Sequence, residues 1–187
     1  MKQINRLVGI AMVVALPSLS QAQDSPRHPL SFGVSGGASV PMGDDAQVGY
    51  NLGGHVLVMP ASLPLLSFRG DVSLDTWKFK SGSAQSAREK TSMLGVAANI
   101  IIKSTSAKAV KPYGIGGLGF YNSKTTGLNG NANFADGVST SNLGVQAGAG
   151  LDFQLSGVTT FLEAKLVNSF TRPESSTWLR AIFGIRF

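Results

Sequence analysis

The sequence predicts an all-β fold, namely an eight-stranded antiparallel up-and-down transmembrane β-barrel. The first observation is the stretch 142–155, in which apolar residues alternate without a break with polar residues or glycine. This alternation predicts a strand with two unlike faces. The second observation is that the non-apolar face carries mainly glycine and few solvating groups, so we expect that face to be enclosed and the apolar face to meet lipid.

The third observation is the number of such segments. Eight follow one another along the chain, each of about 10 to 13 residues, close to the 9 to 11 that a tilted strand needs to cross a bilayer. Eight strands also make the smallest common closed barrel, whose interior is just filled by side chains. Closure is expected because lipid cannot satisfy the hydrogen-bonding groups of a free strand edge.

Alternation predicts the first four strands over residues 31–40, 47–59, 65–77 and from the end of a polar loop at Lys90 to about Lys103. The turn at residues 41–45 contains proline, glycine and two aspartates, and prolines bracket the next turn. The third strand shows its two faces most clearly, because Arg69, Asp71 and Asp75 all lie opposite its apolar residues. Charged groups on an enclosed face need partners.

The other four strands are predicted over residues 112–121, 142–155, a segment around Leu162–Val167, and 177–187. Glycines at 114, 116, 117 and 119 blur the two faces of the fifth strand, for which a bulge is an alternative. Residues 122–141 are rich in Asn, Gly, Thr and Ser and form the longest predicted loop. Ser156 and Gly157 predict a tight hairpin.

The first residues predict a secretory signal peptide. Lys2 and Arg6 precede an apolar run over residues 7–16, and small residues end at Ala22, where we place cleavage. The apolar run is too short for a membrane-spanning helix, which needs roughly 20 residues. The predicted division of the chain is a signal peptide (1–22), a lead-in (23–30) and the barrel domain (31–187).

Composition excludes several other classes of protein. The chain has no cysteine, so it has no disulfide framework, Cys-ligated metal site or lipid-anchored N-terminal Cys. Loss of residues 1–22 removes two basic residues and no acidic one, which lowers the formal charge from +6 to +4. That charge is too mild to indicate nucleic acid as a partner.

Aromatic residues are expected to form two girdles on the lipid face. The predicted girdle at one level comprises Phe32, Phe68, Tyr113, Phe153 and Phe187, and that at the other comprises Tyr50, Trp77, Phe120, Tyr121, Phe170 and Trp178. No charge falls on the predicted lipid face apart from the strand ends.

The last strand carries a resemblance to a known family. Phe183, Ile185 and Phe187 alternate up to the end of the chain, as in the C-terminal strand that the barrel-assembly machinery recognises in outer-membrane proteins. Five residues before the terminal aromatic, where the family often has glycine, this chain has Ile182. The chain from 31 to 187 resembles the membrane domain of outer membrane protein A and its opacity-protein relatives. The resemblance implies an outer-membrane location and a structural, adhesive or host-interaction role.

The inward charges predict an ion-pair network, since they number four of each sign: Arg69, Lys165, Arg180 and Arg186 against Asp71, Asp75, Asp152 and Glu163. We expect Glu163, Lys165 and Arg180 with Asp71 or Asp75 near the middle, and Asp152 with Arg186 toward the periplasmic end. One interpretation is that the network simply fills the interior. The other is a switchable gate that passes small ions.

Catalysis and metal binding find little support in the sequence. A lipid-modifying hydrolase would need a nucleophile activated by histidine, yet only His28 and His55 exist and neither has a fitting Ser and acid nearby. The histidines and acids have no metal-ligand spacing, so no cofactor is predicted. A different class also fits eight strands: a secreted soluble lipocalin-like barrel, whose apolar face would line a ligand cavity.

Candidate contacts lie at the predicted outer rim. The loop 122–141, with Lys124, Phe134 and Asp136, is either a surface that faces a ligand or a solvated cap. The candidates for lipopolysaccharide phosphates are Lys78, Lys80, Arg88 and Lys90. The sequence therefore predicts a monomeric outer-membrane barrel without a wide pore, with a structural or surface-interaction role.

Overall fold

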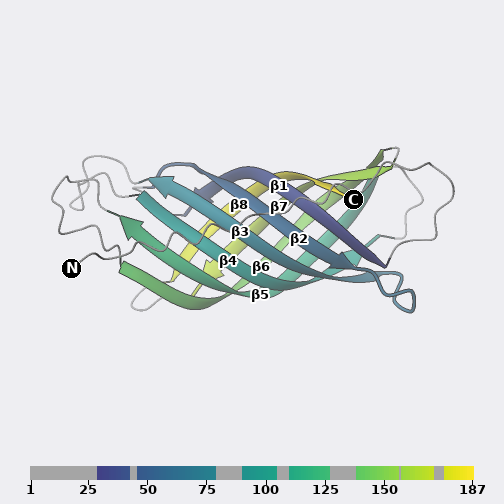
Figure 1. Cartoon of the computed structure of the whole chain (residues 1–187), viewed down its shortest axis with the longest axis horizontal. Helices are drawn as coiled ribbons and strands as arrows, with labels where there is room; N and C mark the ends of the chain where they lie inside the picture. Colours follow the sequence, from purple (N-terminus) through teal and green to yellow (C-terminus); the bar gives the residue numbers. More distant parts are fainter. Residues whose placement is uncertain are drawn as a thin grey trace, which may run out of the picture.

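The computed structural model describes residues 29–42, 46–78, 90–104, 110–126, 138–155, 157–170 and 175–187. Their strands form one closed barrel in which every neighbouring pair is antiparallel (Figure 1). The predicted signal peptide and most of the lead-in, including His28, lie outside the described residues. No helix in the described part of the chain is long and apolar enough to cross a membrane.

Eight strands follow one another around the barrel in sequence order. They are β1 (Leu30–Pro41), β2 (Gly49–Val58), β3 (Leu66–Lys78), β4 (Lys90–Lys103), β5 (Val110–Thr126), β6 (Val138–Leu155), β7 (Val158–Ser169) and β8 (Ser176–Arg186). All are strongly tilted to the long axis of the barrel (Figure 1). The predicted fold class is therefore confirmed.

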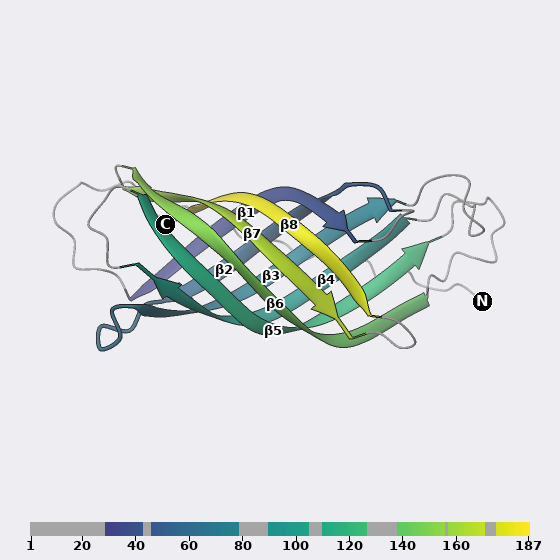
Figure 2. The same cartoon turned by 180° about the vertical axis from the view of Figure 1, so that it is seen from behind.

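The pairing of β1 with β8 closes the sheet. Gly33 faces Arg186 and Pro41 faces Trp178 along an unbroken antiparallel register. Beyond that register, the backbone N–H of Phe187 donates to the carbonyl of Phe32 at 2.8 Å. β8 and β1 lie side by side in the rear view (Figure 2). Because the sheet is closed, every described strand is paired on both sides and no strand edge is left free in the middle of the barrel, as a lipid environment requires.

Apolar side chains face outward and polar side chains face inward. Val72, Leu118 and Leu162 are among many large hydrophobic residues that are exposed on the outer surface. Their sequence neighbours Asp71 and Glu163 are buried in the interior. This arrangement is the reverse of a lipocalin-like barrel, in which the apolar face would line the cavity.

β5 and β6 are longer than the sequence predicts, and the predicted loop 122–141 is correspondingly shorter. Residues 122–126 and 138–141 continue the ladder, with Asn122 opposite Ser141 and Lys124 opposite Ser139. The Asn122 side-chain amide also donates to the Ser141 hydroxyl at 2.9 Å. Polar composition indicated a loop, but such side chains suit a strand that rises out of an apolar band into water. The β5 register runs unbroken on both sides, so the pairs contain no bulge.

The two ends of the barrel differ. At one end, here called the loop end, β1, β3, β5 and β7 finish, and the connections of residues 79–89 and 127–137 begin there. At the other, the terminal end, lies the C-terminus (Figure 1). The β6–β7 connection at the terminal end has only residues 156–157, and Gly157 adopts a φ of 85° that favours glycine.

Inward glycines are required where strands approach closely. A Cβ added at Gly148 of β6 would lie 2.1 Å from the carbonyl oxygen of Ala164, whereas one at the outward Gly114 would meet nothing within 4 Å. We expect Gly148→Ala to lower the free energy of unfolding by about 1–3 kcal/mol. Gly114→Ala, the matched control, should change it by less than about 0.5 kcal/mol. Urea unfolding in lipid vesicles, followed by fluorescence, measures both. Equal midpoints for the two variants would contradict this account of the glycine-rich face.

Candidate functional site

The centre of the barrel interior holds a ring of four charges from β3 and β7. Arg69 makes a two-fold contact with Glu163, with N···O distances of 2.8 and 2.7 Å. Arg69 Nε also lies 2.8 Å from Asp71 Oδ1. Lys165 Nζ completes the ring, 2.9 Å from Asp71 and 3.2 Å from Glu163. Each ion therefore has two neighbours of opposite sign.

Neutral side chains hold the carboxylates of this ring in place. The Tyr113 hydroxyl donates to Glu163 Oε2 at 2.7 Å, and Asn99 Nδ2 donates to Asp71 Oδ2 at 3.1 Å. Gln146 in turn donates to Asn99. Burial of a charge is costly unless the charge is paired and hydrogen-bonded, and these contacts lower that cost. The ring therefore joins β3 and β7 directly, across the barrel, and side chains of β4, β5 and β6 support it with hydrogen bonds.

A second ion pair lies nearer the loop end. Arg180 Nε donates to Asp75 Oδ1 at 3.0 Å, and a second guanidinium nitrogen contacts the other carboxylate oxygen. Asn51 Nδ2 donates to Asp75 Oδ1 at 2.9 Å, and the Ser39 hydroxyl donates to the same oxygen. Asp75 is thus held by β1, β2 and β8 together. A two-fold guanidinium–carboxylate contact also fixes the orientation of both groups.

The third ion pair lies toward the terminal end. Arg186 Nη1 donates to Asp152 Oδ2 at 3.1 Å, and Arg186 Nε donates to His55 Nε2 at 3.4 Å. The guanidinium also lies 5.0 Å from the centroid of the Phe161 ring, a cation–π distance. His55 therefore belongs to a structural contact between β2 and β8. Fewer than three metal-ligating residues gather anywhere in the described part of the chain.

An aromatic layer covers the ion pairs on the loop-end side. Its buried members are Trp77, Met93, Tyr121, Val167 and Trp178. The Arg180 guanidinium lies 5.4 Å from the Trp178 ring centroid and 5.8 Å from that of Tyr121. Bound to Asp75 on one side and to aromatic faces on the other, Arg180 connects the apolar layer with the polar centre.

This layer corrects part of the predicted aromatic girdles. Trp77, Tyr121 and Trp178 are at most 4% exposed and Tyr113 is 5% exposed, so all four face the interior rather than lipid. The girdle prediction considered only the height of each residue along its strand. Alternation contained the missing signal, since Trp77 shares a face with Asp75, and Trp178 shares one with Arg180. The exposed aromatic residues of the two predicted girdles are Phe32, Phe68 and Phe187 at one level and Tyr50, Phe120 and Phe170 at the other.

Glycines on neighbouring strands make room for the interior rings. A Cβ added at Gly95 of β4 or at Gly144 of β6 would lie within 2.9 Å of the Tyr121 ring on β5 between them. Toward the terminal end, a Cβ added at Gly150 of β6 would lie 2.3 Å from the Tyr113 ring on β5. Glycine on the inward face is therefore complementary to the large rings across the sheet.

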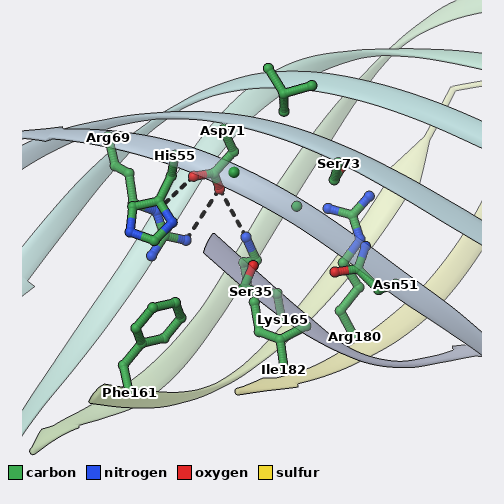
Figure 3. Close-up of a pocket in the computed structure, with 13 residues that line it drawn as sticks. Ser35, Asn51, His55, Arg69, Asp71, Ser73, Phe161, Lys165, Arg180 and Ile182 are labelled. Carbon is green, nitrogen blue, oxygen red and sulfur yellow. Dashed lines mark hydrogen bonds and ion pairs between the residues drawn. The ribbon is translucent and has the colours of Figure 1, made fainter. Parts of the chain in front are cut away.

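A small cavity lies beside the central ring (Figure 3). Its volume is about 20 Å³, and His55, Asp71, Lys165 and Arg180 are among its lining residues. This volume holds about one water molecule. In Figure 3, Asp71 reaches from β3 toward both Arg69 and Lys165.

The remaining sequence-predicted residues lie on the outer surface or beyond the described part. Phe183, Ile185 and Phe187 point outward on the β8 side of the closing seam, with Phe183 and Phe187 exposed. Lys78, Lys90 and Lys124 lie at the loop end of β3, β4 and β5. Lys80, Arg88, Phe134 and Asp136 fall outside the described residues.

A closed eight-stranded barrel with an apolar outer face and a charged interior is the architecture of the small outer-membrane β-barrels. Among solved structures, Neisserial surface protein A is similar with a TM-score of 0.61 at 14% identity, over 85% of this chain and 96% of that one. A major outer membrane protein of Thermus thermophilus is similar with a TM-score of 0.57 at 17% identity, over 86% of this chain and 100% of that one. The outer membrane protein OprG of Pseudomonas aeruginosa is similar with a TM-score of 0.52 at 14% identity, over 84% of this chain and 95% of that one.

These likenesses establish the fold alone, because all three identities are low. No protein-family model matches the sequence, and no curated protein matches it either. The residues of the interior must therefore be interpreted from their own geometry.

The central ring makes a direct prediction about stability. Glu163→Ala leaves Arg69 and Lys165 with Asp71 as their shared acidic partner, so we expect a loss of about 3–5 kcal/mol in the free energy of unfolding. Glu163→Gln keeps the shape and the contact with Tyr113 and should cost less. Urea unfolding in lipid vesicles measures both values. Lys111→Ala, at the terminal end of β5, is the control and should stay within about 0.5 kcal/mol of the parent. A Glu163→Ala midpoint equal to that of the control would show that the ring does not stabilise the barrel.

Proposed function

We propose that this chain is an outer-membrane β-barrel with a structural or surface-interaction role, without a wide pore and without enzymatic activity. The observation that carries the proposal is the inverted distribution of side chains. Hydrophobic residues such as Val96, Ile100 and Phe183 are exposed around the whole barrel, on every strand. Soluble monomers rarely expose a contiguous apolar patch of more than a few hundred Å². A surrounding bilayer is the environment that removes this cost.

The orientation follows from the connections. Outer-membrane barrels have short periplasmic turns and longer outer loops. The two-residue β6–β7 turn lies at the terminal end, whereas the connections of residues 79–89 and 127–137 lie at the loop end. We therefore place the loop end outside the cell. A signal peptide cleaved after Ala22 would deliver the chain to the periplasm, from which the barrel is assembled.

The interior supports a role other than transport. Its ion pairs cancel in charge, and its aromatic layer contains Trp77 and Trp178, whose ring centroids are 5.8 Å apart. Interior groups that bind one another leave little space or free charge for a solute. In this proposal, the residues of the outer connections at the loop end make the contacts with other surfaces.

The final strand fits the proposed contact with the barrel-assembly machinery. Phe183, Ile185 and Phe187 lie on the outward face of β8, beside the seam with β1. The Ser31 hydroxyl donates to the Phe187 carbonyl at 2.5 Å across this seam. A machinery that binds the outward face of β8 could hold that strand until β1 pairs with it. We expect the chain to remain a monomer, since closure pairs every strand.

Single labels test the proposed membrane location, because the chain has no cysteine of its own. Leu151→Cys and Leu162→Cys place a fluorophore on directly paired outward positions of β6 and β7. We expect strong quenching by brominated lipid at both positions and weak quenching at the control Ser141→Cys near the loop end. A chain that stays soluble without detergent, or labels at 151 and 162 that report water, would contradict the membrane assignment.

Shortening one connection tests the surface role. We expect replacement of residues 127–137 by a short Gly-Ser linker to reduce cell adhesion or surface binding, because this change removes an outer connection and keeps the β5–β6 ladder. A heat-dependent shift in gel mobility verifies that the barrel still folds. The control replaces residues 61–64 of the β2–β3 connection at the terminal end, where no effect on adhesion is expected. Unchanged adhesion in the first variant would exclude this connection as the contact surface.

A further inference from the structure

Three lysines gather on the outward face of three adjacent strands at the loop end. Lys78 of β3 lies directly opposite Lys90 of β4. Lys124 of β5 lies opposite Ser92, two positions from Lys90 on the same face. Directly opposed side chains in an antiparallel pair have Cβ atoms about 5 Å apart, and diagonal neighbours about 7–8 Å. The three amines, here called the lysine triad, can therefore reach one common ligand.

The triad has a fixed height above the apolar band. Lys78, Lys90 and Lys124 each lie four residues beyond an exposed apolar residue of the same strand, namely Leu74, Leu94 and Phe120. Four residues at about 3.3 Å each, on a strand tilted by about 40°, correspond to roughly 10 Å along the barrel axis. This is the level of lipid head groups when the apolar band occupies the hydrocarbon core.

The charges of the triad are not balanced by nearby acids in the described part of the chain. All four acidic residues described there, Asp71, Asp75, Asp152 and Glu163, are buried inside the barrel. Among the described residues, the side chains of the triad make neither ion pairs nor hydrogen bonds. Like charges directly opposite each other across a sheet are destabilising. A shared anion would turn this repulsion into attraction.

The triad lies on one side of the barrel. At the loop end of β2 and of β7, the outward positions that correspond to the lysines carry exposed apolar residues, Val48 and Phe170. A general interfacial role for basic residues would distribute them around the barrel. Their clustering on β3–β5 indicates a discrete site.

We propose that the lysine triad binds the phosphate groups of a phosphorylated glycolipid in the leaflet at the loop end. This inference rests on the proposed outer-membrane location. Lysine suits such a site, because its aliphatic stem can lie along the apolar band while its ammonium group reaches the phosphates. The apolar surface around Leu94 and Phe120 would meet the acyl chains of the same molecule. That continuity favours a lipid over a soluble polyanion, which would use the charges alone.

Binding of lipid A in its phosphorylated and dephosphorylated forms tests the proposal. The refolded chain in dodecyl maltoside micelles is titrated with fluorescent bisphosphorylated lipid A and, separately, with the dephosphorylated form. We expect the phosphorylated lipid to bind at least tenfold more tightly, and Lys78→Gln/Lys90→Gln/Lys124→Gln to weaken it by about fivefold per lysine removed. The triple arginine variant should retain binding. Lys111→Gln, on β5 at the opposite end, is the control.

Several outcomes would overturn the inference. These are equal binding of the two lipid forms, unchanged binding by the triple glutamine variant, equal loss in the Lys111→Gln control, or lysine-dependent binding of heparin or inorganic phosphate that exceeds binding of the lipid. If the triple variant loses its heat-dependent gel shift, Lys90→Gln alone is measured, with about fivefold weaker binding expected. Quenching of labels at 151 and 162 is independent of the triad, so failure here is distinguishable from failure of the membrane assignment.

Discussion

The pairing of β1 with β8 is the constraint on which the rest of the structure depends. Once the sheet closes, one face of every strand is enclosed, and a charge on that face is costly unless it pairs within the barrel. The charges do so in three groups stacked along the axis: Arg180 with Asp75, the ring around Arg69 and Glu163, and Arg186 with Asp152. Closure therefore enforces electroneutrality inside, and excess positive charge is left for the two ends.

Packing inside the barrel depends on placing large inward side chains of one strand beside small residues of the adjacent strands. Several large inward rings lie beside glycine on a neighbouring strand, as Tyr121 does beside Gly95 and Gly144, and Tyr113 beside Gly150. The glycine-rich face and the interior aromatic residues are thus two parts of one arrangement. This explains why the non-apolar face of β6 carries glycine in place of solvating side chains.

Much of this fold could be predicted from alternation alone, which identified all eight strands and the inward side of Arg69, Asp71, Glu163 and Lys165. It could not identify which of them meet, because the contact between Arg69 and Glu163 crosses the interior between residues 94 positions apart. That contact depends on the relative heights of β3 and β7, which follow from the registers of all the strands between them. The girdle prediction misplaced four aromatic residues because it considered their height along the strand and not which face of the strand they occupy. The ends of β5 and β6 were missed because local composition does not reveal hydrogen bonds to a neighbouring strand.

The aromatic layer has a consequence for spectroscopy. Trp77 and Trp178 are the only tryptophans of the chain, and they lie together beneath the loop end, with Trp178 close to the Arg180 guanidinium. Intrinsic emission therefore originates from a single region that touches neither acyl chains nor the terminal end. A change in that emission signals a change of the interior at one mouth of the barrel, whereas contact of the outer face with acyl chains must be followed by a different probe.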